Sequence, residues 1–270
     1  MKLIKHIPNF FTSLNLFCGC LAIVCAFHQQ LSWSAYLLGI AAVFDFVDGL
    51  AARVLKAHSE IGKQLDSMAD LVTFGVVPGI ILFQMISSGF TAYFIPIEKR
   101  SFAVLFLSSL AFLVPIFSAI RLAKFNLDER QKENFIGLPT PANAIFIASF
   151  VLILEKQFRL NIYYPPTFEV LFAVLDLYTF SLDTKVAQLL FNPYFLIGIS
   201  VVMSLLLVSE LPMFSMKFKS LKWKENKIRY LFILISAYIF YYYAFMGIPL
   251  IILIYLVLSV GKFVVQKLIS

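Results

Sequence analysis

Two short pieces of sequence decide the fold: DFVDGLAAR at residues 45–53 and GKQLDSMAD at residues 62–70. A mostly apolar stretch precedes the first piece, and another follows the second. An ionisable side chain inside a membrane-spanning segment costs at least about 2.5–3.5 kcal/mol, so four aspartates at the ends of apolar stretches need cationic partners. The flanks therefore indicate membrane-spanning helices, and the aspartates indicate a site between two of them.

The composition of the whole chain agrees with these flanks. Of 270 residues, 61% are apolar and 14% are charged, whereas soluble domains are roughly 45–50% apolar. These values exclude a soluble globule and an intrinsically disordered chain. The net charge of +7 could indicate nucleic-acid binding, but basic loops beside membrane spans give the same surplus.

Stretches long enough to cross a bilayer recur along the chain. A hydrocarbon core about 30 Å thick needs roughly 20 apolar residues in a helix. Helices satisfy their own backbone hydrogen bonds in lipid, and barrel strands would show short alternating segments instead. We count eight spans, at residues 10–28, 31–55, 62–88, 100–120, 140–155, 191–211, 228–244 and 247–266. The predicted fold is therefore an all-α polytopic membrane protein.

The basic residues are distributed unevenly over the connections between these spans. Of the 22 Lys and Arg residues, five fall on one side, at Lys99, Arg100, Lys156, Arg159 and Lys185, and the other 17 on the opposite side. The positive-inside rule makes the richer side cytoplasmic. We therefore expect both termini and the aspartates to be cytoplasmic. Because the topology accounts for the basic residues, we expect no nucleic acid as a partner. Without an evident targeting peptide, this arrangement fits a prokaryotic inner membrane.

One connection between spans has a feature of its own. The longest non-cytoplasmic connection, at residues 156–190, contains a moderately apolar piece at 168–180 that includes Asp176. This piece is too short to span a bilayer. We expect it to lie at the membrane interface.

The four aspartates form two pairs at helical spacing. Asp45 and Asp48 are three residues apart, and Asp66 and Asp70 are four apart. Residues at these separations share a helix face, and the short connection between the two helices brings the pairs together. Mg2+ takes oxygen ligands and is commonly shared between protein carboxylates and substrate phosphates. Four aspartates can hold two such ions.

Arg53 and nearby small residues extend this predicted site. Arg53 follows Gly49 by four residues on the same face and can pair with a phosphate, while Gly49 and Ala52 leave room for a bulky ligand. The pattern predicts phosphoryl transfer, in which metal ions screen the phosphates and a carboxylate deprotonates the incoming hydroxyl. Salt bridges from the acids to Arg53 and Lys56 are the structural alternative, but they do not explain four acids at helical spacing.

The pattern D-x2-D-G-x2-A-R-x8-G-x3-D-x3-D, from Asp45 to Asp70, resembles the signature of the CDP-alcohol phosphatidyltransferases. The resemblance implies a dimeric membrane enzyme whose six-helix core binds a CDP-linked lipid and two divalent cations, Mg2+ or Mn2+. Such enzymes transfer the phosphatidyl group to an alcohol and release CMP. We place the six-helix core at residues 1–211 and two additional helices at 212–270.

The same resemblance implies roles for individual residues. The implied metal ligands are Asp45, Asp48, Asp66 and Asp70, and Asp70 is also the implied base. The residues implied to contact the CDP-linked lipid are Asn9, Thr12, Gly49, Arg53, Ser59 and Gly62.

Two later segments resemble one branch of this family. Residues 118–126, SAIRLAKFN, and residues 137–144, GLPTPANA, are similar to signatures of integral-membrane phosphatidylserine synthases. The match departs at Ile120 and at Lys124, where a lysine keeps the charge of the usual arginine but not its bidentate geometry. This resemblance favours CDP-diacylglycerol as the donor and L-serine as the acceptor. The implied acceptor region contains Arg121, Lys124, Asn126, Gly137, Pro139 and Pro141.

Other interpretations stay open at this point. A synthase of phosphatidylglycerophosphate or phosphatidylinositol would also use cations such as Arg121 and Lys124, which could equally be cytoplasmic anchors. The proline segment could simply start a helix. A cation transporter would use intramembrane acids too, but transporter sites lie near the bilayer midplane, whereas these acids stand near the ends of predicted helices.

Overall fold

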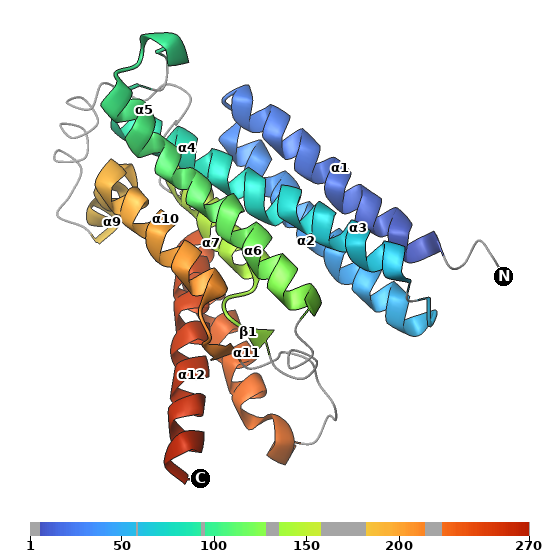
Figure 1. The fold of residues 1–270 in the computed structure, drawn as a ribbon. Coiled ribbons are helices and arrows are strands. Elements are labelled where there is room, and N and C mark those ends of the chain that lie inside the picture. The colour runs from blue at the N-terminus through green and yellow to red at the C-terminus, as the bar shows by residue number, and fades with distance from the viewer. Residues whose placement is uncertain are drawn as a thin grey trace.

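The computed structural model describes residues 6–57, 59–92, 95–127, 135–157, 182–213 and 223–269. Nearly all of these residues are helical (Figure 1), which confirms the all-α prediction. The N-terminal elements are α1 (Ile7–Phe27), α2 (Leu31–Val54), α3 (Glu60–Asp70), the π-helical η2 (Leu71–Val76), α4 (Val77–Gly89), η3 (Ile97–Lys99), α5 (Phe102–Ser109), η4 (Leu110–Phe112) and α6 (Leu113–Leu127). The later elements are β1 (Phe135–Ile136), α7 (Thr140–Leu152), η6 (Ile153–Gln157), α9 (Leu182–Phe191), α10 (Pro193–Val208), β2 (Pro212–Met213), α11 (Trp223–Tyr243), η7 (Ala244–Met246) and α12 (Gly247–Ile269).

Short polar side chains fix where several helices begin. The Ser59 hydroxyl accepts a hydrogen bond from the Gly62 amide at the start of α3, and Ser101 accepts one from Val104 at the start of α5. Asn192 caps α10 in the same way. Such N-caps satisfy amide groups that have no partner within the helix.

The number of spans differs from the eight predicted. Within the described ranges, five stretches are long and apolar enough to cross a membrane, at Ile7–Phe27, Leu31–Val54, Glu60–Gly89, Phe102–Leu127 and Asn226–Gly261. A sixth is the pair Lys185–Phe191 and Pro193–Val208, which is bent by 75°.

Two features account for the lower number. The predicted span at 140–155 is an apolar helix, Thr140–Glu155, that is shorter than the roughly 20 residues a bilayer requires. The last two predicted spans lie within one apolar stretch, Asn226–Gly261, where α11 and α12 meet at η7.

The continuous run of α3, η2 and α4 forms the centre of the bundle. In this run 83% of the most apolar window is buried, against 22–33% in the other four stretches. Small residues allow close contact with α6, because a Cβ on Gly79 would lie 2.8 Å from Pro115 Cδ, and one on Gly75 would lie 3.2 Å from Ser118 Cβ. The first helix also packs here, where a Cβ on Gly19 would overlap the Thr73 hydroxyl.

The segment before α7 is held by the end of α10. Strands β1 and β2 pair antiparallel, with Phe135 opposite Met213. The Gly137 amide donates to the Leu211 carbonyl at 2.9 Å, and the Leu138 amide donates to the Leu206 carbonyl at 3.0 Å. Gly137 has a φ of +75°, which glycine adopts without steric cost. The start of α7 is therefore fixed to the end of α10 and to the chain that follows it.

The C-terminal helices pack against the rest of the molecule. Helix α12 contacts α7 and β2, and it meets α11 at η7. Figure 1 shows α11 and α12 beside each other. The predicted division at residue 211 into a core and an additional pair of helices stays a prediction. The predicted interfacial piece at 168–180, with Asp176, lies outside the described residues.

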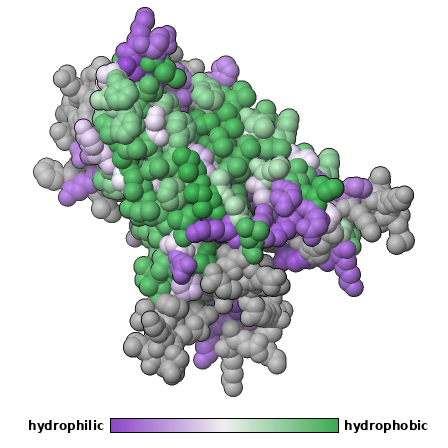
Figure 2. Space-filling view, in the orientation of Figure 1, coloured by the Kyte–Doolittle hydropathy of each residue, from purple (hydrophilic) through white to green (hydrophobic). Residues whose placement is uncertain are grey.

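The visible surface has the distribution expected of a membrane protein. Figure 2 shows apolar residues over much of the upper body of the molecule. Hydrophilic residues gather at the tip where α5 begins and at the opposite end, near the start of α3 and the end of α6. The chain is therefore a polytopic membrane protein.

Candidate active site and metal centre

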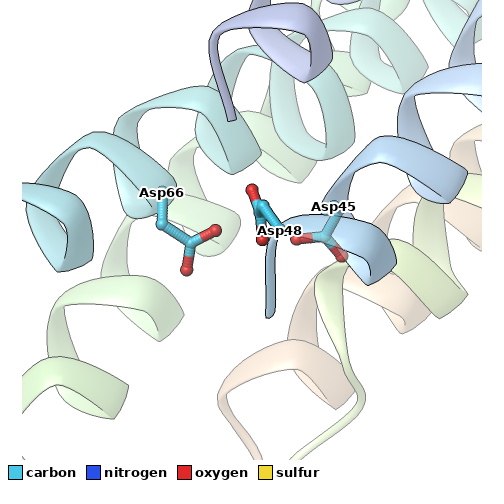
Figure 3. Close-up of side chains that lie close together, drawn as sticks. All are labelled: Asp45, Asp48 and Asp66. Atoms are coloured by element: carbon cyan, nitrogen blue, oxygen red, sulfur yellow. The ribbon is translucent and has the colours of Figure 1, made fainter. Parts of the chain in front are cut away.

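Three of the four predicted aspartates face one another across the gap between α2 and α3. Asp45 and Asp48 come from the last turns of α2, and Asp66 comes from α3. One carboxylate oxygen from each lies within 4.8 Å of the other two. Figure 3 shows the three side chains turned toward the same space. The helical spacing thus places the acids together as predicted.

Asp70 adjoins this cluster one turn further along α3 than Asp66. It is the last residue of α3, immediately before η2, and it is 9% exposed. Its carboxyl group interacts electrostatically with Asp45, Asp66 and Asp48. The Asn15 amide nitrogen donates a hydrogen bond to Asp70 Oδ1 at 3.3 Å. The four acids therefore form one connected group, in which Asp48 and Asp70 are the buried members.

Helix α1 supplies the polar groups that orient the acids. The Thr12 hydroxyl lies 2.6 Å from Asp48 Oδ2 and 3.1 Å from the Pro8 carbonyl. Asn15 follows Thr12 by three residues and so lies on the same helix face. Its role was not predicted from sequence, although its spacing from Thr12 could have indicated it. Thr73 donates to the Asn15 carbonyl at 3.3 Å, which ties α1 to η2 at this level.

The acids fit a divalent cation. Oxygen ligands bind Mg2+ at 2.0–2.1 Å and Ca2+ at 2.3–2.6 Å, so oxygens on opposite sides of one ion lie about 4–5 Å apart. The separation among Asp45, Asp48 and Asp66 is in that range. An all-carboxylate donor set suits hard cations such as Mg2+ or Mn2+. Concentrating this many negative charges in a half-buried site also favours a bound cation.

The residues predicted to contact the CDP-linked lipid lie beside the acids in two groups. Around Gly49, a Cβ would meet no atom within 4 Å, so there is open space above the backbone. Exposed Arg53 donates from Nε to the Gly49 carbonyl at 3.0 Å. Around Gly62, a Cβ would lie 2.9 Å from both Asn9 Oδ1 and the Ser59 hydroxyl. The structure therefore brings Asn9, Ser59 and Gly62 together; their contact with a lipid stays a prediction.

The predicted acceptor residues do not form a single group. Arg121, on α6, is 6% exposed and interacts electrostatically with Asp70, whereas Lys124 is exposed. Asn126 joins α6 to α3: its amide donates to Ser67 Oγ at 2.8 Å, and its carbonyl accepts from Lys63 Nζ at 2.9 Å.

The glycine and prolines of this region lie in the backbone before α7. Gly137 contacts the end of α10, and Pro139 and Pro141 flank the first residue of α7. Of the predicted acceptor set, Arg121 is thus the residue that the structure places beside an aspartate. The acceptor roles of the whole set stay predictions.

Comparison with known proteins agrees with the site. The sequence model of the CDP-alcohol phosphatidyltransferase family matches residues 5–182. A CDP-diacylglycerol–serine O-phosphatidyltransferase of Bacillus subtilis is 36% identical over 137 residues, which is 51% of this chain and 70% of that protein. A protein of the same name from Helicobacter pylori strain J99 is 32% identical over 151 residues, which is 55% of this chain and 58% of that protein.

A further relative comes from an archaeon. The archaetidylserine synthase of Methanothermobacter thermautotrophicus is 30% identical over 149 residues, which is 54% of this chain and 58% of that protein. The chain thus spans less than two thirds of the length of the Helicobacter and Methanothermobacter relatives.

Proposed function

The chain belongs to the CDP-alcohol phosphatidyltransferase family, and on this premise we propose that it is a phosphatidylserine synthase. It transfers the phosphatidyl group of CDP-diacylglycerol to the hydroxyl of L-serine and releases CMP. The observation that carries the transfer reaction is the convergence of Asp45, Asp48 and Asp66 with Asp70 adjoining them. The names of the relatives support serine as the acceptor.

The acids and the open space at Gly49 have different roles in binding the donor CDP-diacylglycerol. Asp45, Asp48 and Asp66 would hold divalent cations, which when bound screen the diphosphate and stabilise the charge on the transferring phosphoryl group. Gly49 leaves space for the diphosphate to approach the backbone. Arg53 reaches the same region and can pair with a phosphate oxygen. Asn9, Ser59 and Gly62 form the adjoining surface for the cytidine.

Asp70 acts on the acceptor. Its carboxylate takes the proton of the serine hydroxyl as the oxygen attacks the phosphorus. Asn15 holds Asp70 in place through the hydrogen bond to Oδ1. Arg121, buried beside Asp70, pairs with the serine carboxylate. The reaction is a direct displacement in which the new P–O bond to serine forms as the bond to CMP breaks.

We also propose the setting in which the reaction takes place. The cations are Mg2+ or Mn2+, the enzyme is a homodimer, and it lies in a prokaryotic inner membrane with both termini and the acids on the cytoplasmic side. The surplus of Lys and Arg on one side of the predicted topology supports this orientation. CDP-diacylglycerol and the surrounding lipids are its membrane partners.

An acceptor comparison tests the proposed function. Purified protein is incubated with CDP-diacylglycerol, Mg2+ or Mn2+, and labelled serine, glycerol 3-phosphate or inositol in parallel reactions. We expect labelled lipid from serine, with equimolar CMP, and loss of both products when EDTA removes the metal. Labelled lipid from glycerol 3-phosphate or inositol, with none from serine, would contradict the serine assignment and leave the family membership intact.

A further inference from the structure

The buried guanidinium of Arg121 has an incomplete set of partners. Among the residues that the structure describes, no group accepts a hydrogen bond from its Nε. A guanidinium carries five N–H donors and remains charged, and burying such a group without acceptors is unfavourable. Arg121 is therefore suited to bind an anionic ligand.

Two side chains act electrostatically on Arg121: Asp70 and Tyr255. Asp70 belongs to the acidic group described above. Tyr255 belongs to α12, which lies beyond the residues 5–182 that match the family model. A C-terminal helix thus reaches the same guanidinium as the acid that acts on the acceptor.

Tyr255 is held firmly in its position. It is 8% exposed, on a buried face of α12 that also carries Ile252 and Ser259. Its ring packs against Phe232 of α11, with centroids 5.7 Å apart and planes at 50°. Helix α12 in turn packs against α7 and β2, so the position of Tyr255 is tied to the segment before α7.

The two neighbours of Arg121 differ in charge. Asp70 offers a negative charge, and a guanidinium with no other partner would turn to it and form a bidentate pair. Such a pair would occupy both the base and the group that receives the acceptor carboxylate. The phenolic oxygen of Tyr255 is a neutral competitor for the N–H donors, and it leaves the charge of Arg121 available to a ligand.

We propose that Tyr255 is a positioning residue that keeps the Arg121 guanidinium from pairing fully with Asp70. Arg121 can then bind the carboxylate of the acceptor amino acid. The α11–α12 hairpin is then a part of the acceptor site. The identity of the acceptor rests on the proposed function, but the juxtaposition of Arg121 with a buried α12 tyrosine does not.

The variant Tyr255→Phe tests this role, because it removes the hydroxyl and keeps the ring that packs on Phe232. Initial rates of CMP release are measured over a range of serine at saturating CDP-diacylglycerol, and over a range of CDP-diacylglycerol at saturating serine. We expect the KM for serine to rise about fivefold, as for the loss of one hydrogen bond. We expect kcat to stay within twofold and the KM for CDP-diacylglycerol to stay unchanged.

Two further variants separate positioning from packing. Tyr238→Phe, at an exposed tyrosine of α11, is expected to match the wild type in all three constants. In an Arg121→Lys background, Tyr255→Phe is expected to raise the KM for serine no further, because it acts through the guanidinium. Thermal unfolding of each purified variant establishes that the fold is retained.

The possible results are distinct. An unchanged KM for serine in Tyr255→Phe, an equal change in the KM for CDP-diacylglycerol, or a full further effect in the Arg121→Lys background would each overturn the proposal. If the wild type makes no product from serine, the proposed function fails. The same variants are then compared by the KM for whichever acceptor does support CMP release, and a change confined to that KM sustains the role of Tyr255.

Discussion

At the scale of single residues, Asp70 differs from the other three aspartates in its surroundings. Asp45, Asp48 and Asp66 have oxygens within 4.8 Å of one another, which suits shared ligation of a cation. Asp70 instead accepts a hydrogen bond from Asn15 and interacts electrostatically with Arg121. These contacts place the Asp70 carboxylate beside Arg121, the residue that we propose binds the acceptor. The difference in surroundings supports a division between ligands and base.

The variant Asp70→Asn tests that division. An amide keeps the shape of the side chain but cannot take a proton from the acceptor, so we expect kcat to fall by about 100-fold to 10,000-fold. Binding of CDP-diacylglycerol, measured by titration in detergent with Mg2+ present, should persist. Glu60→Gln, at an exposed acid in the first turn of the same helix, is the matched control and should keep full activity. A fully active Asp70→Asn protein would show that another group is the base.

Sequence spacing was sufficient to predict the acidic group but not all of the residues that contact it. Residues three or four apart on a helix must share a face, so the pairing of Asp45 with Asp48 follows from the chain alone. The bond from Asn15 to Asp70 joins residues 55 positions apart, and local spacing holds no information on such a contact. The link from Arg121 to Tyr255 depends in the same way on how α12 packs.

At the scale of elements, the segment before α7 shows why the sequence was ambiguous. GLPTPANA was consistent with a helix start and with an acceptor loop, and the structure does show a helix that begins at Thr140. The pairing of β1 with β2 was not predicted, because two-residue strands have no detectable period. We call the β1–β2 pairing, with the hydrogen bonds from Gly137 and Leu138 to the chain around the end of α10, the clip. The clip requires a positive φ at Gly137, whose φ is +75°.

Gly137→Ala should weaken the clip. A residue with a Cβ loses roughly 1–2 kcal/mol in a left-handed conformation, and this Cβ would lie 2.5 Å from the Leu207 carbonyl oxygen. We expect a lower unfolding temperature in detergent and a higher KM for serine. Gly198→Ala, on α10 where a Cβ meets no atom within 4 Å, is the control and should unfold at or slightly above the temperature of the wild type. Equal unfolding temperatures for the two variants would contradict a structural role of the clip.

At the scale of the whole molecule, the disagreement over the number of spans concerns mainly the C-terminal part. The apolar stretch Asn226–Gly261 has 36 residues, and as one straight helix it would be about 54 Å long, far more than a hydrocarbon core of about 30 Å. The chain turns instead at Ala244, whose φ is +45°, and α12 meets α11 there. Two crossings therefore explain this stretch better than one.

Labelling of single cysteines tests both the two crossings and the orientation. In a background without Cys18, Cys20 and Cys25, cysteines are placed at the exposed positions Lys227, before the apolar part of α11, and Tyr243, at its end. If α11 and α12 each cross the membrane, a membrane-impermeant maleimide should label Tyr243→Cys in intact cells and Lys227→Cys after permeabilisation alone. Glu98→Cys, in the exposed η3, should behave like Tyr243→Cys. Labelling of Lys227→Cys in intact cells would place the basic connections outside and refute the predicted orientation, whereas equal protection of both C-terminal positions would refute the two crossings.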